Sequence, residues 1–339
     1  MPEMLDRYRP EIERVLRQAT PSGDGFLYKM MRYHLGFEDE NGVPQPRGIG
    51  KALRPTLCLF ACEAAESDWK LALPAAAAIE LVHNFSLIHD DIQDKDIYRR
   101  HRPTVWYLWG YPQGINAGDG MRELANRALI GLREGGVKPD KILAAFRALT
   151  DCSLEMIEGQ TLDLNFERRL DITVGDYLQM VSWKTGALIE CSFHIGALLG
   201  TDDQKFISAF RRCGRALGLA FQFRDDILGI WGDESATGKS AANDIRRKKK
   251  SLPVVYALER SAGGIKSQLT GHYSHEQLDE AGAATVLSIL DELGAKAYAQ
   301  RMVEEKCSLA LSHLEGLKLS DWARGEMEKL VAFHLNRER

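Results

Sequence analysis

Apolar residues recur along most of this chain with the period of an α-helix, and the alternation typical of β-strands is scarce. Polar stretches at 36–50, 231–251 and 261–273 break the pattern and are predicted to be loop-like connections. The predicted helices cover residues 3–20, 51–66, 73–95, 116–131, 139–168, 174–200, 205–230 and 252–260, with further helices between 283 and 336.

Two of these helices, within 73–89 and 185–199, carry few charged residues on any face. A helix that is apolar all round is usually enclosed by other helices. No linker rich in proline, glycine or serine divides residues 1–339, so we predict one domain, although the length alone would favour two. The expected architecture is an all-α, single-domain helical bundle.

Composition excludes several functional classes. The formal charge of −4 gives no reason to expect nucleic-acid binding. The six cysteines form no Cys-x-x-Cys pair, which suits buried thiols in a reducing compartment. The start of the chain lacks the features of a signal peptide, and the longest apolar stretch, 71–82, is too short to cross a bilayer. We therefore expect a cytoplasmic protein with no transmembrane segment.

Two clusters of aspartate stand far apart in the chain, each within a predicted helix. The first is Asp90-Asp91-Ile92-Gln93-Asp94, in which Asp90 and Asp94 share one helix face. The second contains Asp225 and Asp226, with Asp233 beyond them. Neighbouring carboxylates repel each other unless a cation lies between them, and Mg²⁺ commonly bridges carboxylates to phosphate. Two acidic faces that converge would hold magnesium ions around a diphosphate.

Cationic side chains accompany both clusters. Each one alone is more often a solvated surface charge, but together they offer forked and point-charge ligands for phosphate. They also exceed what one diphosphate requires, which suggests two anionic substrates. These residues are Lys51 and Arg54 at a helix start, Arg99 and Arg100 after the first cluster, Lys184 within an apolar helix, and Lys239 and Lys249 after the second cluster.

Several motifs in a fixed order resemble the trans-polyprenyl diphosphate synthase family, which includes farnesyl and geranylgeranyl diphosphate synthases. The segment Gly50-Lys51-Ala52-Leu53-Arg54-Pro55 is similar to the family's G-K-x-x-R-P sequence. Residues 80–94, followed by Arg99 and Arg100, resemble its first aspartate-rich motif, and residues 222–226 resemble the second. The similarity runs from about residue 25 to residue 260.

This resemblance implies an all-α fold around a central cavity, a homodimer, and Mg²⁺-dependent elongation of an allylic diphosphate by isopentenyl diphosphate. It implies that Asp90, Asp94 and Asp225 coordinate Mg²⁺, with three ions on the bound diphosphate. Asp91 and Asp226 would assist through water or through contacts behind these ligands, so that all five aspartates and Lys184 serve catalysis.

The resemblance also divides the remaining residues between two substrates. The allylic diphosphate would be bound by Arg99, Lys184, Lys239 and Lys249, with Lys248 and Lys250 as alternatives to Lys249. Thr185 and Gln222 would steady the carbocation or its surroundings. Isopentenyl diphosphate would be held by Lys51, Arg54, His83 and Arg100.

The second motif departs from the family pattern at one position. The family often carries a third aspartate where this chain has Gly229, in Asp225-Asp226-Ile227-Leu228-Gly229. Because Asp225 is retained, a metal is still expected there. Asp233 is a partial replacement at most.

Product length depends on residues one helical turn before Asp90. In the family, bulk at such positions limits the growing chain. A large Phe85 beside a small Ser86 favours a C20 product, geranylgeranyl diphosphate, ahead of C15 farnesyl diphosphate or a longer chain. Phe85 alternatively packs between helices without touching the product.

Two other functions also use these motifs. A class I terpene cyclase ionises a prenyl diphosphate with Mg²⁺ but needs no second diphosphate site, so Lys51, Arg54 and Arg100 count against it. A non-catalytic partner subunit of another synthase would not need its aspartates, yet all five are present. We therefore expect an active prenyltransferase.

Overall fold

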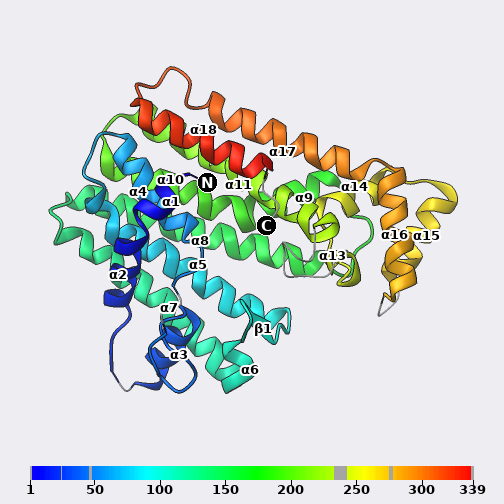
Figure 1. The fold of residues 1–339 in the computed structure, drawn as a ribbon, viewed down its shortest axis with the longest axis horizontal. Helices are drawn as coiled ribbons and strands as arrows, with labels where there is room; N and C mark the ends of the chain where they lie inside the picture. The colour runs from blue at the N-terminus through cyan, green and yellow to red at the C-terminus, as the bar shows by residue number, and fades with distance from the viewer. Residues whose placement is uncertain (1, 24, 46–47, 233–242, 275–277, 337–339) are drawn as a thin grey trace. The chain divides into compact units, whose positions relative to one another are not determined.

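The computed structural model describes residues 2–23, 25–45, 48–232, 243–274 and 278–336, and it is almost entirely helical within these ranges (Figure 1). The single sheet in this part of the chain is a two-stranded antiparallel hairpin. The elements of the first half are α1 (Met4–Arg7), α2 (Arg9–Ala19), α3 (Phe26–His34), α4 (Leu53–Ala64), η1 (Trp69–Ala72), α5 (Leu73–Gln93), β1 (Tyr98–Arg99), β2 (Arg102–Pro103), α6 (Val105–Trp109), α7 (Tyr111–Ile130), η2 (Gly131–Arg133) and α8 (Pro139–Phe166).

The second half continues in the same style, and it includes one short π-helix, η3. Its elements are α9 (Val174–Val181), η3 (Ser182–Gly186), α10 (Ala187–Gly200), α11 (Gln204–Trp231), α13 (Asn243–Arg246), α14 (Leu252–Arg260), α15 (Gly263–Ser274), α16 (Glu280–Glu292), α17 (Ala295–Ser312) and α18 (Asp321–Asn336). The prediction of an all-α fold is confirmed.

The contacts divide the chain into two compact units. Unit 1 comprises Met1–Asp151, Cys191–Phe210 and Lys318–Glu326, and unit 2 comprises Cys152–Glu190, Arg211–Leu317 and Met327–Arg339. The first acidic motif belongs to unit 1 and the second to unit 2. A single domain therefore stays a prediction.

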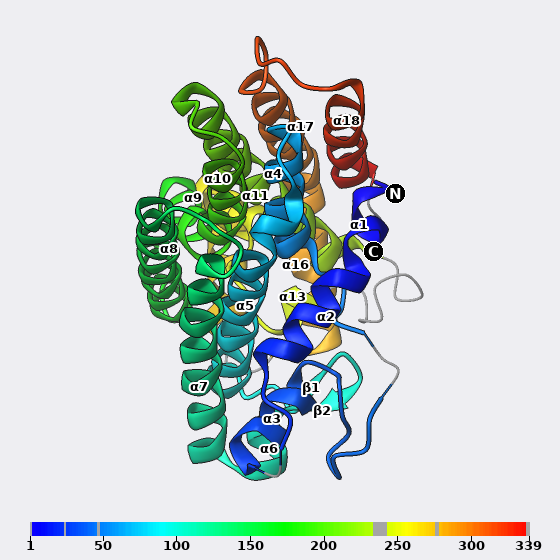
Figure 2. The ribbon, with the colours of Figure 1, turned by 90° about the vertical axis from the view of Figure 1, so that its left-hand side faces the viewer.

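In unit 1, α5 and α7 lie side by side, and α4 and α2 pack against α5 (Figure 2). Glycine allows the close approach of α7, because a side chain at Gly118 would overlap the imidazole of His89 on α5. The α5 helix begins with Pro74 in its first turn, where the missing N–H costs nothing, and most of its side chains are buried. As predicted, it is a central helix.

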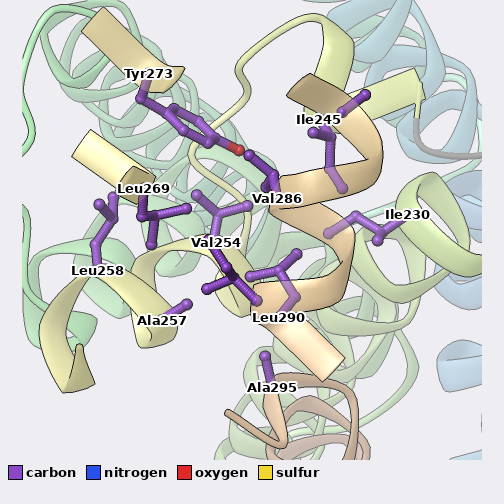
Figure 3. Close-up of a cluster of buried hydrophobic side chains, with 12 residues drawn as sticks. Ile230, Ile245, Val254, Ala257, Leu258, Leu269, Tyr273, Val286, Leu290 and Ala295 are labelled. Carbon is purple, nitrogen blue, oxygen red and sulfur yellow. The ribbon is translucent and has the colours of Figure 1, made fainter. Parts of the chain in front are cut away.

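Unit 2 has its own apolar cluster, built from α13, α14, α15 and α16 together with the ends of α11 and α17 (Figure 3). Val254, Val286 and Leu290 are completely buried in it. This cluster fixes α13 and α14, which flank the lysines that follow the second acidic motif.

Three boundaries differ from the sequence pattern. Residues 261–273 were expected to form a loop, but most of them belong to helix α15. That prediction is wrong because two buried residues four apart, Leu269 and Tyr273, hold a polar segment against the cluster of unit 2. The first helix is divided into α1 and α2 before Pro10, and the helix predicted over 174–200 is interrupted by the π-helix.

One helical stretch in the described residues, Trp69–Gln93, is long and apolar enough to span a membrane, with a mean hydropathy of 1.5. It is longer than the apolar segment 71–82 visible in the sequence. However, 72% of its apolar window is buried inside the structure, as in the core helix of a soluble protein. The stretch is therefore weak support for a membrane span.

Candidate active site

The first acidic motif lies at the carboxyl end of α5, and its three aspartates differ in exposure. Asp91 is buried, Asp90 is half-buried, and Asp94, which caps the helix, is exposed. The backbone N–H of Asp94 still donates to the carbonyl of Asp90 over 2.8 Å, so the two residues remain one helical turn apart. Asp90 and Asp94 thus form a carboxylate pair at the helix end, while Asp91 points into the protein.

Asp91 is held by Arg99 of the hairpin. Arg99 Nε and Nη2 each lie 2.7 Å from Asp91 Oδ1. Burial raises the pKa of the Asp91 carboxyl to about 7, although Arg99 opposes this shift. The second oxygen, Oδ2, is buried without a hydrogen-bond partner in the structure. The predicted diphosphate ligand Arg99 therefore also anchors the first motif.

The residues predicted to hold isopentenyl diphosphate meet beside the middle of α5. Arg54 Nη1 lies 3.3 Å from His83 Nε2. Burial and then the positive charge of Arg54 keep the pKa of His83 well below its usual value, so this imidazole is neutral. Lys51 is exposed just before α4. The geometry joins Arg54 and His83 directly.

A buried carboxylate lies next to this group. Glu80 accepts a 3.0 Å hydrogen bond at Oε1 from Asn84 Nδ2, and burial raises its pKa, opposed by Arg54 and Arg100. Glu80 thus lies close enough to Arg54 and Arg100, two arginines of the predicted isopentenyl diphosphate site, for their charges to act on it. A buried charge of this kind requires such partners.

The β1–β2 hairpin aims Arg100 at the loop before α4. Arg100 and His101 both have positive φ, 51° and 61°, a conformation that hairpin turns normally give to glycine or asparagine. Gly50, with φ +43°, leaves room for the guanidinium, since a Cβ there would lie 3.1 Å from Arg100 Cζ. The structure therefore brings Arg100 against the Gly50-Lys51 segment. Lys51 and Arg100 are expected to bind the same substrate, isopentenyl diphosphate.

A pocket of about 130 Å³ opens beside this hairpin, within unit 1. Its polar lining includes Arg99, Arg100, Arg102, Asp91 and His34. His34 ends α3, and burial followed by the nearby arginines keeps its pKa well below the usual value. An arginine-rich pocket with a neutral histidine suits an anionic group.

In unit 2, the second motif buries Asp226 among neutral donors. Tyr177 Oη donates a short hydrogen bond to Asp226 Oδ2, the backbone N–H of Leu252 donates to the same oxygen over 2.8 Å, and Gln222 Nε2 donates to Oδ1 over 3.0 Å. Burial still raises the pKa of this carboxyl. Asp226 thereby ties α11 to α9 and to the start of α14, while Asp225 beside it is half-buried.

The π-helix η3 carries Lys184 and Thr185. Lys184 Nζ lies 2.5 Å from Asp163 Oδ2 on α8, and Thr185 Oγ1 donates to Gln222 Oε1 over 2.8 Å. Single π turns inside helices are rare and frequently mark functional sites. The structure therefore joins Thr185, Gln222 and the second acidic motif through consecutive hydrogen bonds.

Lys249 and Lys250 differ sharply in their surroundings. The Lys249 side chain is 45% exposed; its partial desolvation lowers its pKa, but the carboxylates around it, above all Asp244, hold this pKa above its usual value. Lys249 Nζ lies 3.7 Å from Asp244 Oδ2. Lys250 is buried elsewhere, 4.8 Å from the ring centre of Tyr273, and burial lowers its pKa to about 8. The electrostatics thus group Lys249, rather than Lys250, with the second motif.

Gly229 makes room for another carboxylate. A side chain at this position would overlap Asp244 Oδ2, which reaches α11 from α13. Gly229 follows Asp225 by one helical turn. The space beside it is therefore filled by Asp244, which is buried. Asp233 and Lys239 lie outside the described residues.

Within the described chain, no group of three or more His, Cys, Asp or Glu side chains is arranged to hold a metal ion. The donors that are present are carboxylate oxygens, with Asp90 and Asp94 one turn apart. Mg²⁺ prefers oxygen ligands and commonly keeps waters while binding one or two carboxylates and a substrate phosphate. This donor set fits such an ion.

The predicted chain-length residues face different partners. Phe85 is buried and packs edge-on against His89, with ring centres 5.1 Å apart. Ser86 Oγ donates to the carbonyl of His83 over 2.8 Å. Both side chains lie on α5 between the Arg54–His83 pair and the aspartates.

Several polar residues at these sites were not predicted, among them His34, Glu80, Asp163 and Asp244. Glu80 carried a usable signal, since a charged residue within an apolar helical stretch requires a partner. Asp163 did not, because it lies in a segment that contains several other polar residues. Asp244 lies in a polar, basic segment, where the sequence pattern does not mark a single aspartate as a site residue. His34 ends a helix that the sequence interpretation omitted.

Comparison with known proteins agrees with these motifs. A family model described as polyprenyl synthetase matches residues 46–290. The (2E,6E)-farnesyl diphosphate synthase of Mycobacterium tuberculosis is 36% identical over 330 residues, covering 96% of this chain and 90% of that protein. The geranylgeranyl diphosphate synthase of the same species is 37% identical over 311 residues, covering 92% and 88%.

Solved structures give the same picture. The polyprenyl synthetase from Streptomyces coelicolor is 36% identical, with a TM-score of 0.90 and 98% of each chain covered. The geranylgeranyl pyrophosphate synthetase from Pyrococcus horikoshii is 33% identical, with a TM-score of 0.89 and 99% of each chain covered. The chain therefore belongs to the polyprenyl synthetase family of trans-prenyltransferases.

Proposed function

We propose that this prenyltransferase condenses isopentenyl diphosphate with an allylic diphosphate and releases an all-trans polyprenyl diphosphate. The observation that carries the proposal is the division of labour within each acidic motif. One aspartate is buried in protein contacts, Asp91 or Asp226, while Asp90, Asp94 and Asp225 remain half-buried or exposed. The buried residues fix the helical segments that carry the motifs, and the others lie closer to the surface, where a metal-complexed diphosphate would reach them.

In this proposal, Asp90, Asp94 and Asp225 hold Mg²⁺, with three ions on the bound substrate. When bound, the ions supply positive charge that stabilises the departing diphosphate. Arg99, Lys184 and Lys249 bind the same diphosphate through charged hydrogen bonds, which strengthen as negative charge collects on it. Lys239, outside the described residues, is proposed for the same role.

The chain's other residues position the second substrate. Arg54, His83 and Arg100, with Lys51, hold isopentenyl diphosphate so that its double bond attacks the allylic carbon. A neutral His83 donates or accepts one hydrogen bond without repelling the arginines. Thr185 and Gln222, already hydrogen-bonded to each other, present oxygen atoms near which a carbocation is stabilised. Apolar walls keep water from the cation.

We propose geranylgeranyl diphosphate, C20, as the product, ahead of C15 farnesyl diphosphate or a longer chain. Relatives of similar identity are named for both C15 and C20 products, so the choice depends on this chain's own residues. Phe85 is the bulky residue one turn before the aspartates, and its edge-on contact with His89 fixes the ring in place. A ring held in this way would form the floor of the product site, that is, the surface at which elongation of the chain stops.

Replacing Phe85 with Ala tests this floor. The smaller side chain should lengthen the main product by at least one C5 unit, as resolved by chromatography of the dephosphorylated products. Ser86→Ala, which removes only a hydroxyl bonded to the His83 carbonyl, is the matched control and should leave the product unchanged. An unaltered product from Phe85→Ala would reject Phe85 as the floor.

The activity is tested by incubation with Mg²⁺, isopentenyl diphosphate and each allylic primer in turn. Consumption of isopentenyl diphosphate with release of a longer diphosphate is the expected result. A cyclised hydrocarbon made without isopentenyl diphosphate would favour a terpene cyclase instead. No product unless another synthase is added would favour a partner subunit. We further propose that the protein is cytoplasmic and forms a homodimer. Sedimentation of the purified protein tests the homodimer.

A further inference from the structure

The π-helix that carries Lys184 is enclosed by backbone contacts. On one side, a side chain at Gly159 of α8 would overlap the backbone of Lys184 itself. On the other side, a Cβ at Gly218 of α11 would lie 2.7 Å from Gly186 Cα. Two neighbouring helices therefore pack directly on the π turn, which leaves its backbone little room to shift.

A π turn spaces the helical hydrogen bonds one residue wider than an α-helix does, and a donor from a neighbouring helix can hold such a turn in place. Arg215 of α11 is such a donor. Its Nη1 donates to the carbonyl of Ser182, the first residue of the π-helix, over 2.6 Å, and to Ser182 Oγ over 3.1 Å. Gly186 gives the side chain passage, because a Cβ there would lie 3.2 Å from Arg215 Cδ.

Two carboxylates hold this guanidinium in place. Arg215 Nη1 and Nη2 donate to the two oxygens of Glu155 on α8, over 2.8 and 3.0 Å. Arg215 Nε also makes a short hydrogen bond to Glu190 of α10, which is nearly buried. Burial lowers the pKa of Arg215, but the hydrogen bonds to Glu155 and Glu190 and the negative charges of these carboxylates outweigh it and hold this pKa above its usual value. All three nitrogens of this guanidinium thus donate to acceptors of the protein.

We propose that Arg215 is a positioning residue for the allylic diphosphate site: by binding the Ser182 carbonyl, it fixes the π turn that presents Lys184. The inference rests on the proposed role of Lys184 in binding that diphosphate. Lys184 follows Ser182 by two residues, and its ammonium is already directed by Asp163. A small displacement of a binding group lowers catalysis steeply, so a fixed backbone at this point matters.

Steady-state kinetics with geranyl diphosphate and isopentenyl diphosphate tests the inference. Arg215→Lys keeps the charge but loses the fork that reaches Ser182 and Glu155 together. This variant should raise KM for geranyl diphosphate about tenfold and change KM for isopentenyl diphosphate less than about twofold. Arg211→Met is the matched control, because Arg211 is more exposed and pairs with the same carboxylate, Glu190, from outside the π turn. It should leave both constants unchanged.

The double variant Arg215→Lys/Lys184→Met separates positioning from general damage. If Arg215 acts through Lys184, adding Arg215→Lys to Lys184→Met should cost less than about threefold further in kcat/KM. Losses that multiply would overturn the inference, as would a wild-type KM for geranyl diphosphate in Arg215→Lys. If Lys184→Met alone keeps its KM, the proposed role of Lys184 fails instead.

Folding is checked separately. Arg215→Met strands two carboxylates and is expected to be strongly destabilised. The combination Arg215→Met/Glu155→Gln/Glu190→Gln removes those charges as well. Compared with Glu155→Gln/Glu190→Gln, it should show the same selective rise in KM for geranyl diphosphate, and equal constants in the two proteins would overturn the inference.

Discussion

Asp91 of the first acidic motif and Asp226 of the second are both about 1% exposed, yet they meet different partners. Asp91 is paired with one cation, Arg99, through a single oxygen, and its other oxygen has no hydrogen-bond partner in the structure. Asp226 accepts three hydrogen bonds from neutral donors on three separate segments. The same Asp-Asp pair is thus fixed by an ion pair in one unit and by a hydrogen-bond network in the other.

This difference shows how one short motif serves two local architectures. The first motif ends a helix, so a hairpin must supply its cation. The second lies within α11, where neighbouring segments reach it with a phenol and a backbone N–H. A further contrast follows one turn after the first aspartate of each motif: Asp94 stands there in the first, whereas Gly229 in the second admits the carboxylate of Asp244.

The largest effect is expected for a residue outside these buried contacts. Asp90→Ala should lower kcat by about 10²–10³-fold, because it removes a proposed ligand of the ions that would stabilise the leaving diphosphate. The circular dichroism spectrum and melting temperature should not change. Asp151→Ala, an exposed aspartate on α8, is the control and should be fully active. Normal turnover by folded Asp90→Ala would refute its role.

The buried aspartates should affect folding unequally. Asp226→Ala strands the hydroxyl of Tyr177 and the N–H of Leu252 in the interior and should lower the free energy of unfolding by about 3 kcal/mol. Asp91→Ala releases Arg99, which is 28% exposed and can reach water, so about 1 kcal/mol is expected. Urea unfolding measures both. Equal losses would remove the distinction between ion pair and network.

Gly229 offers a sharper test of the second motif. Gly229→Ala would force the Asp244 carboxylate away and should cost about 1–3 kcal/mol of stability. Gly271→Ala is the matched control: nothing lies within 4 Å of its added Cβ, and the helix should gain slightly, by about 0.5–1 kcal/mol. If Gly229→Ala is as stable as Gly271→Ala, Asp244 does not need this space.

The smallest effect concerns pH and separates Lys250 from Lys249. The pKa of Lys250 is about 8 in the folded protein and about 10.5 in an unfolded chain. Between these values the unfolded state binds more protons, so the stability rises as pH increases through this window, and the cost of the buried charge is fully present below pH 8.

Lys250→Met should therefore be more stable than the wild type at pH 7, by on the order of 3 kcal/mol. The difference should shrink between pH 8 and pH 10.5. Urea unfolding at several pH values measures it. A constant difference across this range would show that Lys250 does not titrate there, and would remove the reason to separate it from Lys249.

The sequence predicted the helices, the two acidic motifs and the cations because these depend on local periodicity and residue type. It also predicted the central position of α5, since a helix without a polar face must be enclosed. It could not show which aspartate of each pair turns inward, because the burial of Asp91 and Asp226 depends on contacts with residues distant in the sequence, such as Arg99 and Leu252. The acceptance of Asp244 by Gly229 likewise depends on α13 and α11 meeting in space.

One loop prediction failed for the same reason. Residues 261–273 lack a helical apolar pattern. The helix α15 is stabilised by tertiary packing, because Leu269 and Tyr273 are buried in the apolar cluster of unit 2. Conversely, the two lysines Lys249 and Lys250 are indistinguishable in a basic run, and only their partners separate them.

The central claim is that both acidic motifs act on one metal-bound allylic diphosphate. The most direct measurement is kcat/KM for geranyl diphosphate, at saturating Mg²⁺, of Asp90→Asn, Asp225→Asn and the double variant. Mutations of residues that act on one reacting group have strongly non-additive effects. The kcat/KM of the double variant should therefore lie within about threefold of that of the less active single variant. Losses that multiply in the double variant would contradict the claim.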